Sequence, residues 1–209
     1  MQKIWDISQT LRIGIPVWPG DTAFSSERTW VLEGGCPVNV AKFSLSTHSG
    51  THADAPLHYH AQGCAIADVD PGKYIGPCIV IDVTAVESCV LPEHIEANLP
   101  ERVERVLLKT YETFPSDEWV DNYVAVSPDT IDLIAARGGI LIGVDSPSLD
   151  PQEAKVLTAH KAVQHHQMAI LEGLVLDDIV PGDYELIAPP LKLADVDASP
   201  LRALLRSIT

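Results

Sequence analysis

Short runs of apolar residues recur along the chain, and most are rich in Val and Ile and bounded by Gly, Pro or Asp. Runs of this length and composition are typical of β-strands. The pattern predicts strands over residues 3–7, 22–32, 38–45, 78–83, 105–109, 140–144, 169–171 and 184–187.

Helical patterns are fewer. Ser127-Pro128-Asp129 provides an N-cap, a proline at the first helical position and an early acidic residue, and this predicts a helix that runs to Gly138-Gly139. A second helix is expected over 153–166 and a short third one from Pro92, whereas 200–208 fits helix and strand equally well. Many strands with few helices predict an α/β fold, with a mixed curved β-sheet or open barrel-like core and helices packed outside.

Length and composition place the chain among single-domain globular proteins. Its 209 residues suit one domain, 1–209, and the apolar content of 46% is enough for a substantial core. No apolar run approaches the ~18 residues that span a membrane, and the first residues lack the apolar segment of a signal peptide. We therefore expect a cytoplasmic protein.

The charge excludes two classes of partner. The net charge is −15, with only 14 Lys and Arg, which argues against binding to nucleic acid and to anionic membrane surfaces. The four cysteines form no CxxC pair, and a core of this size does not depend on disulfides, so we expect reduced thiols.

Residues 47–60, THSGTHADAPLHYH, hold four of the eight histidines. Four side chains that can bind metal or transfer protons occupy even positions in it: His48, His52, Asp54 and His58. Alternate residues of an extended chain share a face. Gly50 and Pro56 disfavour a regular helix. We therefore expect a strand that ends near Thr47, followed by a bent, extended loop that carries these side chains inward.

Two imidazoles and a carboxylate with spacings of four and two residues suit a zinc ion and leave a coordination position for water. The two oxygens of Asp54 could bridge two ions about 3.5–4 Å apart. A single histidine is more often a structural or surface residue, but the combination of two histidines and an acid in phase favours a metal site. His60 shares the even parity, yet nothing distinguishes it from a solvated residue.

The stretch HSGTHADAPLH resembles HxGTHxDxPxH, the metal-binding signature of the metal-dependent cyclase superfamily. WDIS near the start, VWPGD at 17–21 and GVDSPSLD at 143–150 extend the resemblance over nearly the whole chain, as do a later histidine and glutamate. The combination is most similar to the superfamily's bacterial arylformamidases, also called kynurenine formamidases.

The resemblance implies a role for each matching position. It implies a first metal ion bound by His48, His52 and Asp54, with Asp54 bridging to a second ion that His160 and Glu172 complete. It further implies that His58 moves protons and that Trp18 contacts substrate. Members of this type commonly use zinc, two ions per subunit, or in some relatives manganese, and form homodimers.

Without the resemblance, the roles of His160, Glu172 and Trp18 have weaker support from the residues themselves. His160 would by itself be an exposed helix histidine, and His165 and His166 have equal claim. Glu172 could instead form an ion pair, and Trp18 could be a packed loop anchor. Asp145 lies in the GVDSPSLD segment and has no assigned role.

The reaction that the resemblance implies is hydrolysis of N-formyl-L-kynurenine to L-kynurenine and formate. Bound metal would lower the pKa of water toward ~7, and His58 would pass a proton to the leaving amine. Two alternatives stay open, and a third, a serine hydrolase, is disfavoured. A relative that opens cyclic amides would share the metals, and a metal-dependent scaffold would lack turnover, although His58 favours an enzyme. A serine hydrolase would need a GxSxG motif, which is absent.

Overall fold

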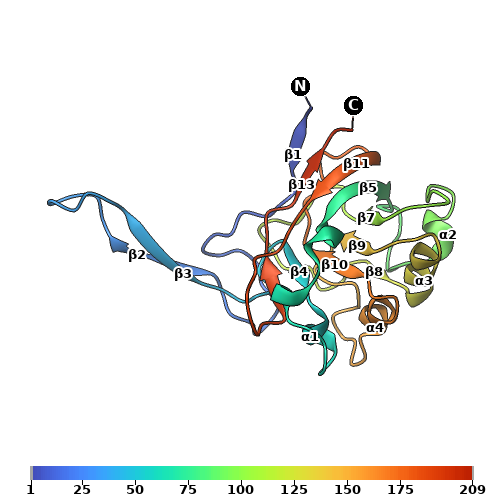
Figure 1. Cartoon of the computed structure of the whole chain (residues 1–209), viewed down its shortest axis with the longest axis horizontal. Helices are drawn as coiled ribbons and strands as arrows, with labels where there is room; N and C mark the ends of the chain where they lie inside the picture. Colours follow the sequence, from blue (N-terminus) through green and yellow to red (C-terminus); the bar gives the residue numbers. More distant parts are fainter. Residues whose placement is uncertain (1, 209) are drawn as a thin grey trace.

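A nine-stranded sheet in the order β1-β13-β11-β5-β7-β9-β10-β4-β12 forms the body of the protein (Figure 1). The structure is a computed structural model and describes residues 2–208. The strands are β1 (Ile4–Asp6), β4 (His52–Asp54), β5 (Ile75–Asp82), β7 (Arg105–Lys109), β9 (Leu141–Val144), β10 (Ala169–Glu172), β11 (Gly182–Ile187), β12 (Ala198–Pro200) and β13 (Leu204–Arg206).

The sheet is mixed. Strands β5, β7, β9 and β10 are parallel neighbours, while β1, β13 and β11 on one side and β4 and β12 on the other pair antiparallel. The sheet curls into a half-barrel with few helices. The predicted α/β fold with a curved, open barrel-like core is therefore confirmed.

Each face of the sheet carries its own apolar layer, because alternate strand residues point to opposite faces. In β7, Leu107 belongs to one layer, while Val106 and Leu108 belong to the other. The second layer is covered by three helices: α2 (Pro92–Ile95), α3 (Pro128–Ala136) and α4 (Thr158–His165). The first layer packs inside the curl and is closed by two short 3-10 helices, η1 (Ile66–Asp68) and η2 (Pro71–Tyr74).

Local signals placed most elements correctly. The strand over 105–109 has the predicted bounds, and α3 begins after Ser127, whose Oγ accepts from the Thr130 amide at 3.2 Å. Helix α4 begins at Thr158, five residues later than predicted. The Asp150 carboxylate accepts from the amides of Ala159 and His160 (2.9 and 3.1 Å) and caps the helix there. The ambiguous segment 200–208 contains the end of β12 and strand β13, and no helix.

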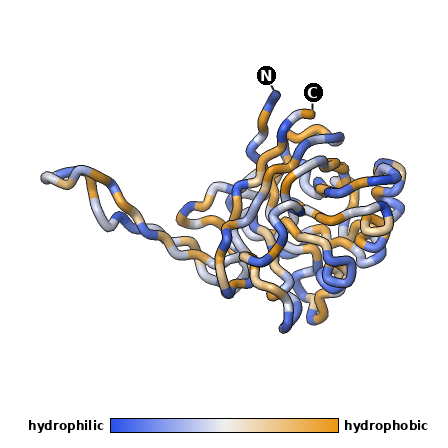
Figure 2. Tube along the Cα trace, viewed as in Figure 1, coloured by the Kyte–Doolittle hydropathy of each residue, from blue (hydrophilic) through white to orange (hydrophobic). Residues whose placement is uncertain are grey.

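Strands β2 (Ser25–Trp30) and β3 (Val40–Ser44) form a separate hairpin that projects from the body (Figure 1). We call residues 24–44 the arm. Every residue of its two strands is exposed. Figure 2 shows that hydrophobic stretches fill the body and also extend along the arm. The two strands were predicted, but they do not join the main sheet. A further small sheet pairs β6 (Cys89–Val90) with β8 (Ala125–Val126).

The histidine-rich stretch is not one extended segment. It consists of a turn, strand β4 and a single helical turn, α1 (Pro56–Tyr59), which has Pro56 at its first position. The prediction of a continuous extended loop was therefore wrong at its C-terminal end. His58 reaches the same region as β4 from a helical turn, and only His52 and Asp54 share a strand face.

All four cysteines are free thiols. Within residues 2–208, no helix is long and apolar enough to cross a membrane.

A close backbone contact between Gly50 and Gly173 yields a stability prediction. Both have left-handed backbone angles (φ +63° and +64°), and a Cβ on Gly173 would lie 2.7 Å from the Gly50 carbonyl oxygen. Gly34 has a similar φ of +61° in open space. We expect Gly173→Ala to lower the free energy of unfolding by about 1–3 kcal/mol more than Gly34→Ala, because only the first adds steric overlap. Urea denaturation measures both, and equal losses would contradict the crowding argument.

Candidate metal centre

Strand β4 places two of the predicted ligands between two neighbouring strands. His52 and Asp54 are two residues apart and therefore project from the same face. In the antiparallel pairing with β10, His52 lies directly opposite Glu172. Strand β12 covers the other edge of β4. All three side chains are buried, with residue exposures of 4% or less.

Three further histidines converge on Asp54 from other segments. The turn at Gly50 brings the Nδ1 atom of His48 to 3.0 Å from Asp54 Oδ1. Helix α4 brings the Nε2 atom of His160 to 3.3 Å from Asp54 Oδ2, and α1 brings His58 Nε2 to 4.0 Å from the same oxygen. The structure thus brings together all six residues predicted to bind metal or transfer protons. We call them the cluster: His48, His52, Asp54, His58, His160 and Glu172.

Asp54 and Glu172 each direct one carboxylate oxygen toward His52 and the other toward His160. Oδ1 of Asp54 faces His48 and His52, whereas Oδ2 faces His160. Oε2 of Glu172 lies 3.5 Å from His52 Nε2, and its Oε1 lies 3.5 Å from His160 Nε2. This arrangement offers two adjacent cation positions with shared carboxylates. His48, His52 and Asp54 could hold one ion, and Asp54, His58 and His160 could hold another.

Unpaired buried atoms show that these side chains fit a metal ion. His52 Nε2, His160 Nε2 and both carboxylate oxygens of Asp54 are buried without a hydrogen-bond partner. Leaving such atoms unpaired is costly. Their separations of 3.3 and 3.5 Å match those of ligands at about 2.0–2.2 Å in tetrahedral geometry around zinc. The opposite ring nitrogens are occupied, since His52 Nδ1 lies 2.9 Å from the Gly50 carbonyl and His160 Nδ1 lies 2.6 Å from Asp150.

The protonation of the cluster reflects its excess of negative charge. Burial alone would lower the pKa of His48, but the neighbouring carboxylates of Asp54 and Asp197 raise it to about 9. In the same way, Asp150 and Asp54 outweigh burial and raise the pKa of His160 to about 10. Burial opposes ionisation of Asp54, yet its histidine partners hold its pKa well below the ordinary value. The carboxylates therefore require compensating positive charge, which a divalent cation can supply in place of protons.

Two more carboxylates organise the surroundings, and neither was assigned a role from sequence. Asp150 caps α4 and holds the ring of His160. Asp145 is buried and accepts from the amides of Thr110 and Tyr111, which orders the loop after β7. Burial raises the pKa of Asp145 to about 6 despite these hydrogen bonds.

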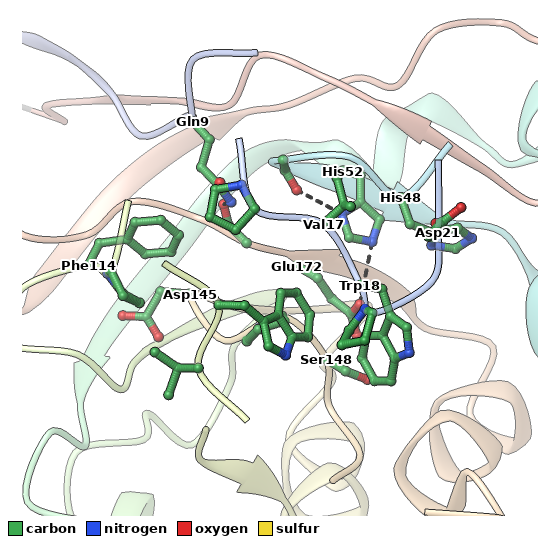
Figure 3. Close-up of a pocket in the computed structure, with 18 of the residues that line it drawn as sticks. Gln9, Val17, Trp18, Asp21, His48, His52, Phe114, Asp145, Ser148 and Glu172 are labelled. Atoms are coloured by element: carbon green, nitrogen blue, oxygen red, sulfur yellow. Dashed lines mark hydrogen bonds and ion pairs between the residues drawn. The ribbon is translucent and has the colours of Figure 1, made fainter. Parts of the chain in front are cut away.

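The cluster lies in the wall of a cavity of about 550 Å³ with aromatic lining. Trp18, which the resemblance implies as a substrate contact, lines the cavity and packs edge-on against Trp119, with ring centroids 5.4 Å apart. Figure 3 shows Trp18 and Phe114 around the same cavity as His52 and Glu172. Sequence reasoning missed Trp119 and Phe114, because no motif marks them. Among the lining residues in the described part of the chain there are acids but no Lys or Arg.

The remaining histidines lie outside the cluster. His166 pairs with Asp132 at 2.7 Å, and His165 packs against His166. His160, by contrast, is 1% exposed, so its reading as an exposed helix histidine was wrong. His60 is linked to α1 through its backbone amide, which donates to Pro56, and its side chain has no place in the cluster.

Comparisons with known proteins identify a family and several similar structures. Residues 5–151 match the model of the Cyclase family. A solved structure described as a potential metal-dependent hydrolase with cyclase activity is 27% identical over 100% of both chains, with a TM-score of 0.86. A predicted metal-dependent hydrolase from Bacillus stearothermophilus is also 27% identical, over 99% of this chain and 98% of that one, with a TM-score of 0.84. Isatin hydrolase A from Labrenzia aggregata, bound to benzyl benzoate, is 25% identical over 100% of this chain and 94% of its own, with a TM-score of 0.85.

Adding metal ions to the metal-free protein should raise its stability, and the gain should depend on Asp54. An ion at 100 times its Kd adds about 2.7 kcal/mol to stability, roughly 5–10 °C in melting temperature for a chain of this size. We expect added zinc to produce this shift in the wild type and none in Asp54→Asn. Differential scanning fluorimetry after chelation measures it. Asp21→Asn, which changes a cavity acid outside the cluster, should keep the full shift, and a full shift in Asp54→Asn would exclude the bridging role.

Proposed function

Because the chain belongs to the Cyclase family, we propose that it is a metal-dependent hydrolase of amide bonds. The observation that carries the proposal is the set of unpaired buried atoms around Asp54, in the wall of an aromatic cavity. Relatives described as metal-dependent hydrolases support it, as does isatin hydrolase, since isatin is an aromatic cyclic amide.

We propose zinc as the cofactor, two ions per subunit, with manganese as the alternative. His48, His52 and Asp54 would hold one ion and His160, Glu172 and Asp54 the other, since each carboxylate has one oxygen toward each set of histidines. Nitrogen and oxygen ligands of this kind suit zinc. When bound, such ions lower the pKa of a water molecule and polarise the substrate carbonyl.

His58 is positioned to carry the proton. Its side chain is 31% exposed, in contrast to the four buried members of the cluster, and it lines the cavity. Its Nε2 points toward Asp54 Oδ2 from 4.0 Å, the longest of the histidine distances to that carboxylate. It can therefore accept a proton beside the reacting carbonyl and deliver it to the leaving amine nitrogen.

As the specific substrate we propose N-formyl-L-kynurenine, which would give L-kynurenine and formate. The aromatic lining by Trp18, Trp119 and Phe114 suits its aryl ring. The carboxylates of Asp21 and Glu118 also line the cavity and can face the substrate's ammonium group. A neutral cyclic aromatic amide is the second candidate, because no Lys or Arg in the described lining pairs with a substrate carboxylate.

One assay tests the function and separates the two substrates. Bound metal is quantified, and loss of N-formyl-L-kynurenine and of isatin is followed before chelation, after it and after zinc is restored. We expect turnover that disappears on chelation and returns with zinc. Undiminished turnover by the metal-free protein would exclude the mechanism. Hydrolysis of isatin alone would select the cyclic-amide alternative, and full metal occupancy without turnover of any amide would indicate a metal-binding scaffold.

The His58→Ala variant separates ligand from proton carrier in the same assay. We expect it to retain two metal ions per subunit and to lose at least about 100-fold in kcat, a typical contribution of general acid–base catalysis. Loss of one metal equivalent would show that His58 is a ligand, as its place beside Asp54 and His160 also permits.

We also propose that two copies form a homodimer through the arm. Six large apolar residues of the arm are exposed: Trp30, Val31, Leu32, Val38, Val40 and Phe43. An isolated two-stranded hairpin is at best marginally stable in water, and contiguous exposed apolar surface marks interaction sites. The arm extends away from its own body (Figure 1). Exchange of arms between two copies buries both in one closed, twofold-symmetric assembly.

Light scattering after size-exclusion chromatography tests this assembly. The wild type should have about twice the chain mass of 22.6 kDa, and Phe43→Asp should shift it toward the monomer, because a charge replaces an exposed aromatic side chain. Ser25→Asp adds the same charge at a polar position of the arm and should remain dimeric. A monomeric wild type would exclude the dimer, and an unchanged Phe43→Asp would exclude the arm as its interface.

A further inference from the structure

Asp197 joins the cluster from a part of the chain that no sequence motif marked. It directly precedes β12, whose Ala198 lies opposite Asp54 in the sheet. Its backbone carbonyl accepts from the Ala55 amide at 2.8 Å, and its Oδ1 accepts from the Thr47 hydroxyl at 3.0 Å. Both the backbone and the carboxylate of Asp197 are therefore fixed to the histidine-rich stretch, at Ala55 and at Thr47.

The other carboxylate oxygen of Asp197 contacts two histidines at once. Oδ2 lies 3.1 Å from His48 Nε2 and 3.3 Å from His58 Nδ1. The two imidazole rings lie side by side, with centroids 4.2 Å apart. One carboxylate thus lies behind a predicted metal ligand and behind the predicted proton carrier.

This contact decides which ring nitrogens carry hydrogen. An ionised carboxylate only accepts hydrogen bonds, so the ring nitrogens that face Asp197 are the donors. In each neutral ring the opposite nitrogen then keeps its lone pair. These are Nδ1 of His48 and Nε2 of His58, which both point toward Asp54.

We propose that Asp197 is a positioning residue that fixes the tautomers of His48 and His58, so that one ring binds metal and its neighbour accepts a proton. The expected effect on catalysis rests on the proposed hydrolase function, whereas the tautomers themselves do not depend on it. Carboxylates behind metal-bound histidines typically contribute 10- to 100-fold in metal affinity or activity. The Asp197 side chain is 39% exposed, so its loss leaves little buried polar surface unpaired.

Three variants test the role in the full-length protein. We expect Asp197→Ala to lower kcat by about 10- to 100-fold at an unchanged KM, with two metal ions still bound at saturating zinc. Asp197→Asn keeps an acceptor oxygen and should recover part of kcat. Asp195→Asn changes a neighbouring acid outside the cluster and should match the wild type, since asparagine tolerates its positive φ of 60°. Loss of one metal equivalent in Asp197→Ala would make Asp197 a ligand and overturn the proposal.

A second readout needs no substrate. Long-range 1H–15N spectra of the metal-free protein, recorded where His58 is neutral and assigned with His58→Ala, should show hydrogen on Nδ1 in the wild type. Asp197→Ala should move the population toward hydrogen on Nε2. An unchanged tautomer would overturn the inference even if the enzyme is active. If the wild type hydrolyses no amide, the proposed function fails, while the spectra still decide the role of Asp197.

Discussion

The buried charge of Asp54 and Glu172 is the constraint on which this structure depends. Taking carboxylates out of water costs several kcal/mol each unless nearby groups compensate them. Both are almost completely buried, and apart from the Leu149 amide, which donates to Glu172, the groups that face them are histidines. In the absence of an ion, protons on His48 and His160, whose pKa values are raised to about 9 and about 10, can supply this charge. A divalent cation satisfies the same requirement and also pairs the orphaned atoms, so charge balance and metal affinity have one origin.

The fold separates this charge requirement from substrate recognition. Asp54 and Glu172 lie on adjacent strands whose other faces belong to the apolar core, and their spacing follows from the strand pairing. The walls of the cavity come instead from loops, with Trp18 before β2 and Trp119 after β7. Rigid strands hold the charged groups at fixed distances, while loop side chains can vary with the substrate.

A second tier of carboxylates orients the histidines. Asp150 holds His160 through Nδ1 and also caps the helix that carries it. Asp197 occupies the corresponding place behind His48 and His58. The rings of His160, His48 and His58 are therefore oriented by carboxylates that lie 10 to 149 residues away in sequence.

The sequence by itself determined most of the strands, though not β4, β6, β8 and β12, as well as the start of α3 and part of the core of the site. Alternation and local caps are read from neighbouring residues, and the period of two placed His52 and Asp54 on one face. Other features only the tertiary structure decided. His160 could not be separated from His165 and His166 by spacing; contacts of α4 with Asp54 and Asp150 decide between them. Asp197, the late start of α4 and the exclusion of the arm from the main sheet also depend on partners distant in sequence. Hydrogen bonds and burial between remote segments leave no local pattern, and for that reason they had to be seen in the folded chain.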